Sequence, residues 1–295
     1  MMMRVTQQML HQNSLRHMNQ NLSRLEKTNN QVSTGKQLHR PSDDPNGVSK
    51  AMNLKSALAA NEQYERNTNE ATLWLDETDQ TINDMVNVMQ RVRELAVQGS
   101  NDTLSDHDKS AIASEVEELT EQVRQFANSK VNGNYLFNGQ KTKEAPYPDK
   151  DSYKTNPFDT GAKTFTIADG VVVQANVTAD KLFGNAEDDA NLFQTLNNLS
   201  EGLRSGSPTS IEQIDKGIER ILSTGAEAGA RQNRVEAVGN RIKDSNLELK
   251  SMLSKIEDID YAEAITRLKS EESIYQATLA ASAKIIQPSL MDFLR

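Results

Sequence analysis

Apolar residues recur every three or four positions along much of this chain, which is the spacing of one face of an α-helix. The longest run extends without a slip from Leu54 to Ala96. A helix of about 50 residues is about 75 Å long at 1.5 Å per residue, whereas helices in globular proteins average about 11–12 residues. Such a helix does not fit an ordinary compact domain, so the pattern predicts partner helices of similar length.

Residues 5–34 carry a narrower stripe of the same period. Its spacing is that of the a and d positions of a coiled coil, and one member is a polar asparagine. A stripe this short leaves an isolated helix marginal in water, so we expect the segment to be held loosely in the monomer. The residues of this stripe are Leu15, Met18, Leu22, Leu25, Asn29 and Val32.

Turn signals separate the helical runs. Residues 35–47 contain two prolines and several turn-forming side chains. Within them, Asp44 before Pro45 is the combination expected where a helix begins, with a capping carboxylate and a proline at the first helical position. Ser105 and Asp108 resemble a capping box with Asp in place of Glu. They predict a third helix that is able to fold back on the second.

The middle of the chain has a different pattern. Residues 131–185 contain Asn-Gly turn signals and three prolines. Thr164–Ile167 and Val171–Val177 flank an Asp-Gly pair, which predicts a β-hairpin. This segment therefore reads as a small β-rich insertion.

Helical spacing resumes at Leu192 and, after a break near Pro208, continues from Ile211 to Ile259. A last stripe follows and is interrupted by Pro288. The two ends of the chain must return to each other for their stripes to be buried. The residues of the last stripe are Ile265, Leu268, Tyr275, Leu279, Ile286 and Phe293.

These patterns predict a mainly α fold. We expect a long antiparallel coiled coil or helical bundle formed by the N- and C-terminal segments, with the β-rich insertion in the middle. Three parts are predicted: residues 1–45 with 256–295 as a terminal coiled coil, 46–140 with 190–255 as a central helical bundle, and 141–189 as the insertion.

Composition agrees with long helices and excludes several functions. Hydrophobic residues make up 36% and aromatic residues 5% of the 295 residues, which suits narrow stripes better than one large core. The net charge of −9 repels the phosphates of nucleic acids. The chain has no cysteine, so disulfides and thiolate metal sites are excluded. We find no apolar run of the ~18 residues that a membrane span needs, and no conventional signal peptide.

Motifs for catalysis or cofactor binding are also missing. The four histidines, His11, His17, His39 and His107, do not have the spacing of metal ligands. Neither a phosphate-binding glycine loop nor a nucleophile elbow is found. We therefore predict no catalytic residue, no cofactor and no metal site.

Both terminal regions contain distinctive strings of residues. They are RVT at 4–6, QVSTGK at 31–36, RPSDDP at 40–45, NGNYLFNG at 132–139, EDIDYAEAIT at 257–266, YQATLA at 275–280 and KIIQPSLMDFL at 284–294. These strings resemble the flagellin superfamily and, within it, the hook-associated protein 3 family. The resemblance covers residues 1–140 and about 190–295, and it is weakest in the insertion.

This resemblance implies a function. It implies a structural subunit, not an enzyme, that joins the hook-side junction of a bacterial flagellum to its flagellin filament. It implies an extracellular location, reached through the flagellar type III channel without a cleaved signal peptide. Implied partners are hook-associated protein 1, flagellin, further copies in a ring or tube, and an export chaperone that holds the C-terminal helix. Nucleic acid and membrane insertion are not implied.

We expect the terminal helices to order fully only when neighbouring subunits bury their stripes. Three alternatives stay open: flagellin itself, an unrelated coiled-coil adaptor, and an enzyme carried by the insertion. The predicted assembly interface consists of Leu15, Met18, Leu22, Leu25, Val32, Leu268, Tyr275, Leu279, Ile286, Leu290 and Phe293.

Overall fold

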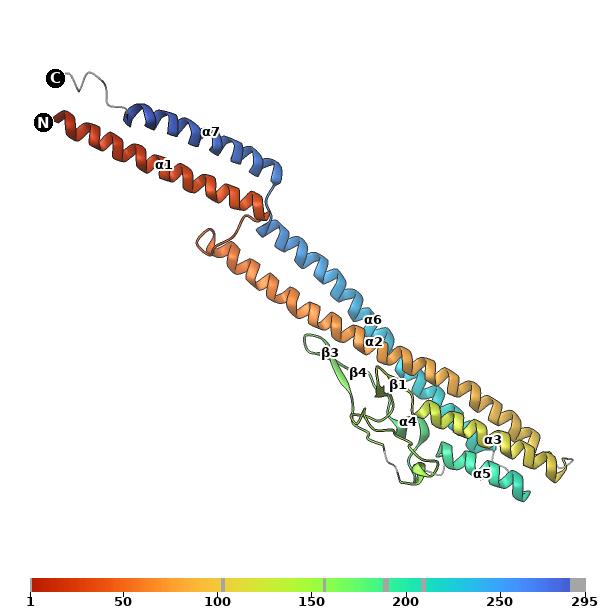
Figure 1. The fold of residues 1–295 in the computed structure, drawn as a ribbon. Coiled ribbons are helices and arrows are strands. Elements are labelled where there is room, and N and C mark those ends of the chain that lie inside the picture. The colour runs from red at the N-terminus through yellow and green to blue at the C-terminus, as the bar shows by residue number, and fades with distance from the viewer. Residues whose placement is uncertain (1, 102–103, 156–157, 188–190, 208–210, 287–295) are drawn as a thin grey trace. The chain divides into compact units, whose positions relative to one another are not determined.

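The computed structural model describes residues 2–101, 104–155, 158–187, 191–207 and 211–286, and most of them are helical (Figure 1). This confirms the predicted fold class of long helices around a small β-rich middle. The helices are α1 (Met2–Thr34), α2 (Pro45–Gly99), α3 (Asp106–Ala127), α4 (Ala179–Phe183), α5 (Leu192–Ser205), α6 (Ile211–Glu257) and α7 (Tyr261–Ile286).

The chain forms two compact units. Residues 1–59 with 246–295 form the terminal unit, and residues 60–245 form the central unit. Helices α2 and α6 contribute to both units. The three-part division expected from the sequence remains an interpretation of the pattern.

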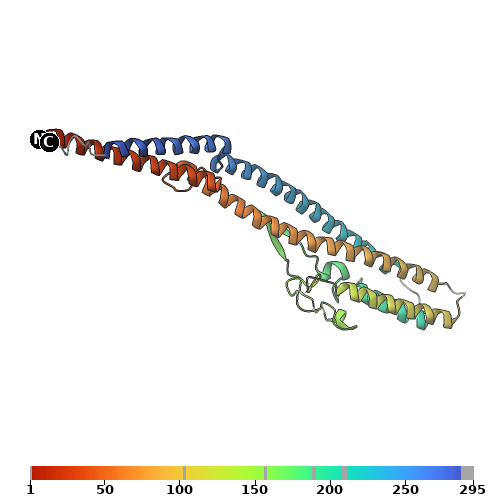
Figure 2. The same ribbon diagram turned by 45° about the horizontal axis from the view of Figure 1, so that its top comes forward.

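In the terminal unit, α1 and α7 run antiparallel and side by side (Figures 1 and 2). The loop after α1 and the short link before α7 form an isolated antiparallel bridge between Lys36 and Asp258. The Ile259 amide donates a hydrogen bond to the Gly35 carbonyl oxygen at 3.1 Å. Gly35 has φ +71°, and a Cβ there would lie 2.6 Å from the Tyr261 hydroxyl. Both the backbone and the close approach therefore require glycine.

Glu257, at the end of α6, links this helix to the loop after α1 and to α2. Its buried carboxylate accepts hydrogen bonds from Lys36, at 3.2 Å, and from Lys55. Burial alone would raise the pKa of Glu257, but the hydrogen bonds from the two lysines outweigh it and lower the pKa. The carboxylate is therefore held in its charged form.

The predicted start of α2 is confirmed. Asp44 precedes Pro45, the first residue of the helix, and its carboxylate accepts the Asn46 amide at 3.1 Å. The capping box of α3 is confirmed as well, because the Ser105 hydroxyl accepts the Asp108 amide and donates to the Asp108 carboxylate.

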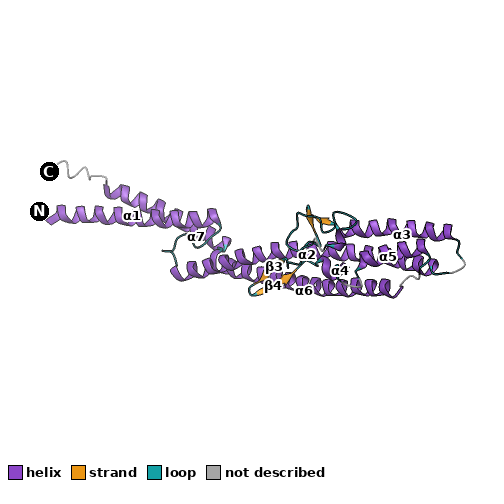
Figure 3. Cartoon of the chain, turned by 90° about the horizontal axis from the view of Figure 1, so that it is seen from below, coloured by secondary structure: helices purple, strands orange, loops and turns teal. Residues whose placement is uncertain are grey.

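In the central unit, α2 lies along α6 and α3 lies along α5 (Figures 1 and 3). Glycines on α6 permit the close approach to α2, because a Cβ on Gly225 would lie 3.0 Å from Ile82. The face of α2 predicted from its spacing forms the core. Its fully buried large side chains are Leu75, Met85, Met89 and Leu95.

The insertion contains two small antiparallel sheets among the described residues. Strands β1 (Lys130–Val131) and β2 (Asn134–Tyr135) form one, and β3 (Thr164–Ala168) and β4 (Val171–Gln174) form the other. A single 3₁₀ turn, η1, covers Ser152–Lys154. The predicted hairpin is therefore present, although β4 is shorter than expected.

Buried asparagines join the loops of the insertion. Asn138 accepts the Asp159 amide and donates to the Glu144 carbonyl. Asn176 accepts the Lys163 amide and donates to the Gly161 carbonyl. These side chains satisfy backbone groups that a longer sheet would otherwise pair. The insertion also packs aromatic rings against α5, so it shares the core of the central unit.

We predict that Leu75→Ala lowers the free energy of unfolding by about 2–5 kcal/mol, because it leaves a cavity in the core. Leu73→Ala is the matched control on the same helix: Leu75 is 0% and Leu73 40% exposed. The control should change the free energy by less than about 0.5 kcal/mol. Urea unfolding of the full chain, followed by circular dichroism, measures both. Equal losses would contradict the assignment of this helix face.

We predict that Glu257→Gln destabilises the terminal unit by about 1–2 kcal/mol at neutral pH. Glu257 has a lowered pKa in the folded state, so the stability it contributes is present at neutral pH and is lost as the pH falls below the ordinary carboxyl value of 4.5. The variant should therefore lose less stability than the wild type on acidification. Glu263→Gln, which removes an exposed pair with Arg267, is the control. Parallel pH profiles of wild type and Glu257→Gln would refute this role.

Candidate assembly interface

The contact between α1 and α7 contains as many polar as apolar side chains. Helix α7 is the element packed along α1, so the less exposed side of α1 marks the contact. These positions follow one another by four and three residues, as the a and d positions of a coiled coil do. They are Ser14, Met18, Asn21, Leu25, Thr28 and Val32.

This corrects part of the predicted stripe. Met18, Leu25 and Val32 lie in the contact as expected, but Leu15 and Leu22 are each 38% exposed. Asn29 is also exposed. The spacing placed all six residues on one seam. In the structure every second contact position lies one residue earlier, at Ser14, Asn21 and Thr28, which places the buried Asn21 opposite the Thr278 hydroxyl.

Helix α7 shows the same arrangement. Of the predicted residues, Leu268 and Tyr275 lie in the contact, whereas Leu279 is 42% exposed. The Ile286 side chain, Leu290 and Phe293 lie outside the described residues. The positions of α7 that face α1 are Ala264, Leu268, Glu271, Tyr275, Thr278 and Ser282.

Four exposed apolar side chains lie on one side of this helix pair. Leu15 and Leu22 each follow a d position of α1 by one residue, and Ile265 and Leu279 each follow a d position of α7. Because the helices are antiparallel, positions just after d fall on the same side of the pair. Ile265 is 48% exposed. We call these four residues the terminal patch.

A polar network crosses the contact within the helix pair. The Asn21 amide donates to the Thr278 hydroxyl at 2.8 Å, and its oxygen accepts from Arg24. Arg24 also pairs with Glu271 of α7 at 3.6 Å. The sequence does not predict this network, because a polar residue one position away from a leucine stripe is typical of a solvent-exposed helix face.

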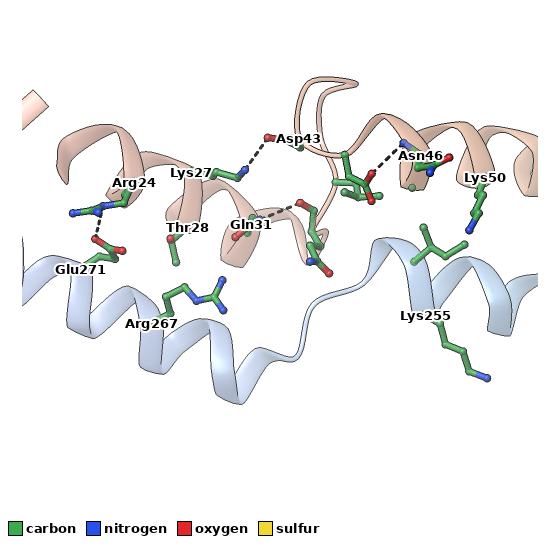
Figure 4. A pocket seen from close by; sticks show the side chains of 15 residues that line it. Arg24, Lys27, Thr28, Gln31, Asp43, Asn46, Lys50, Lys255, Arg267 and Glu271 are labelled. Atoms are coloured by element: carbon green, nitrogen blue, oxygen red, sulfur yellow. Dashed lines mark hydrogen bonds and ion pairs between the residues drawn. The ribbon is translucent and has the colours of Figure 1, made fainter. Parts of the chain in front are cut away.

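A pocket of about 570 Å³ lies between the end of α1, the following loop and the facing parts of α6 and α7 (Figure 4). Five basic and three acidic side chains line it. Ion pairs connect its walls: Lys27 lies 2.9 Å from Asp43, and Arg24 reaches Glu271. The hydrogen bond from Lys27, with amides of the loop, lowers the pKa of Asp43 to about 2. The ion pair between Lys27 and Asp43 thus holds the loop against α1.

The described residues contain no group of three His, Asp or Glu side chains arranged to hold a metal ion. No helix in the described ranges is both long and apolar enough to cross a membrane. Trp74 is buried in the core, with the Lys163 ammonium 3.8 Å from the ring centre.

Comparison with known families matches both ends of the chain. Residues 5–142 match the family model described as the bacterial flagellin N-terminal helical region. Residues 211–294 match the bacterial flagellin C-terminal helical region. The matched segments contain all of α2, α3, α6 and α7 and most of α1.

Individual proteins agree with these models. Flagellar hook-associated protein 3 of Escherichia coli is 27% identical over 95% of this chain and 96% of that protein. Flagellin of Halalkalibacterium halodurans is 23% identical over 93% of both. The structure of a flagellar hook-associated protein from Vibrio parahaemolyticus superposes with a TM-score of 0.65 at 21% identity, covering 73% of this chain and all of that one. The chain therefore belongs to the flagellin superfamily, in which it is similar to hook-associated protein 3.

Proposed function

We propose that this chain is the structural subunit that joins the hook side of a bacterial flagellum to the flagellin filament. The observation that carries the proposal is the likeness to hook-associated protein 3 of Escherichia coli over nearly the full length of both chains. Flagellin is the second candidate, supported by a lower identity over a similar length. The chain acts by assembly and not by catalysis.

The terminal patch supports assembly through the terminal helices. Burying a leucine or isoleucine side chain fully contributes about 1.5–3 kcal/mol, so four side chains that are each about 40% exposed contribute roughly 3–4 kcal/mol together. The loss of translational and rotational freedom on association costs about 4 kcal/mol or more, which offsets this gain. A single contact is therefore weak, and we propose that each subunit uses several neighbours in a closed ring or tube.

The half-polar contact between α1 and α7 fits ordering on assembly. Fixing the backbone costs about 1–2 kcal/mol per residue, and a contact with few buried apolar side chains offsets little of that cost. We propose that the two helices open readily in the monomer and are stabilised when neighbours cover the terminal patch. Leu290 and Phe293 belong to the same proposed interface.

Partners follow from the proposed position in the flagellum. Hook-associated protein 1 contacts the hook side, flagellin contacts the filament side, and copies of this chain contact one another. Export through the flagellar type III channel places the subunit outside the cell, and a chaperone holds the C-terminal helix before export. A coiled-coil adaptor would instead remain inside the cell, and an enzyme would need a reactive site in the insertion.

We predict that deletion of this chain leaves bare hooks and releases soluble flagellin into the medium, because exported flagellin then has no junction to grow on. Electron microscopy of the deletion strain and a flagellin assay of the medium measure this. Intact filaments would refute a junction role. Bare hooks without flagellin in any fraction would identify the chain as the filament subunit.

We also predict that Leu22→Asp with Leu279→Asp abolishes incorporation into flagella while the central unit stays folded, because charged side chains oppose burial of the terminal patch. The matched control is Leu73→Asp with Leu222→Asp, at two leucines of the central unit that are 40% and 52% exposed. Immunoblots of purified flagella measure incorporation, and circular dichroism checks the fold. Wild-type incorporation of the patch variant would rule out this interface.

A further inference from the structure

We propose that the hydrogen bond between Asn21 and Thr278 sets the register of α1 against α7 and thereby aligns the two halves of the terminal patch. This inference rests on the proposed assembly function and adds a positioning role that the assembly interface itself does not contain. Asn21 is only 7% exposed and Thr278 is partly buried, so we place both inside the helix pair and not among the residues that contact neighbouring subunits. They act through the leucines that follow them in the sequence.

The network is specific because the Thr278 hydroxyl already donates one hydrogen bond and can only accept a second. The Thr278 hydroxyl donates to the Ile274 carbonyl at 2.8 Å, so its lone pair accepts the Asn21 amide. The Asn21 oxygen accepts from Arg24, which also reaches Glu271. Donors and acceptors on both helices are thus used together at one level of the pair. The Asn21 amide and the Thr278 hydroxyl are both hydrogen-bonded, and a paired polar layer of this kind specifies an arrangement that apolar contacts leave open.

The neighbouring apolar layers do not select one register. Met18 and Leu25 flank Asn21 on α1, and Leu268 and Tyr275 lie on α7. Flexible or unbranched side chains such as methionine fit several arrangements. A slip of seven residues would keep these residues on the seam but would separate Asn21 from Thr278 and Arg24 from Glu271. A buried amide would then lose its partner, which disfavours the slipped state.

Register matters because it determines which exposed side chains lie together. Leu22 follows Asn21 and Leu279 follows Thr278 in the sequence. The hydrogen bond between Asn21 and Thr278 therefore also fixes the positions of the two leucines relative to each other. A slip of one heptad displaces one leucine from the other by about 10 Å along the axis. The neighbouring subunits would then meet two separated side chains instead of one patch.

This role predicts opposite effects on stability and assembly. Asn21→Leu with Thr278→Val replaces a polar layer with an apolar one, and polar residues in coiled-coil seams lower stability while they specify register. The melting temperature of the terminal unit should therefore stay the same or rise, while incorporation into flagella falls. A contact that only stabilises the helix pair would move both quantities in the same direction.

The absence of cysteine permits a direct measurement of register. Spin labels on Gln12→Cys and Ser270→Cys sit on exposed positions of α1 and α7, roughly 20 Å apart along the axis. The full chain with Asn21 and Thr278 intact should give one distance population. The Asn21→Leu, Thr278→Val variant should give an additional population, shifted along the axis by about 10 Å.

Two controls complete the experiment. The exchanged pair, Asn21→Thr with Thr278→Asn, keeps an amide and a hydroxyl in the layer and should restore one distance and incorporation. Asn19→Leu makes the same kind of substitution at an exposed position of α1 and should change neither. A single wild-type distance in the Asn21→Leu, Thr278→Val variant would overturn the proposal, as would a lower melting temperature together with lost assembly. Label distances in the isolated chain test register even where the junction function fails.

Discussion

The antiparallel contact between α1 and α7 is the interaction on which the terminal unit depends, and its chemistry is unusual for a coiled coil. Half of the α1 positions that face α7 are polar. Because these polar residues lie between the two helices, the leucines that directly follow two of them in α1 remain partly exposed. The pair is thus half polar inside and carries the exposed apolar side chains of the terminal patch on one side. We propose that the stability of the monomer and its capacity for assembly are opposed in this unit.

The central unit shows the opposite balance. Its long α2 face, its close glycine contacts with α6 and its aromatic cluster bury large side chains completely. Charged groups there lie mostly at the surface, whereas the terminal unit uses the buried Glu257 carboxylate and two lysines at the joint of its helices. The central unit therefore buries most of its large apolar side chains completely, whereas the terminal unit leaves several of its own exposed.

Much of this architecture was predictable from the sequence, because period and turn chemistry are local. The unbroken spacing from Leu54 to Ala96 predicted the long helix, and Asp44 with Pro45 predicted where it begins. The place of Asn21 in the contact instead of Leu22 was not predictable, because it depends on a partner 257 residues away in the chain. The buried asparagines of the insertion were missed for the same reason. Asn138 reads as a turn residue, and only the fold shows that it joins distant backbone segments.

The central claim is that assembly covers the terminal patch. A single cysteine introduced as Leu22→Cys reports on it, because the chain contains no other thiol. Maleimide labelling of the secreted monomer and of purified flagella measures how accessible this position is in each state. The account predicts rapid labelling in the monomer and strongly reduced labelling in flagella. Equal labelling in both states would contradict it, because the patch would then remain exposed after assembly.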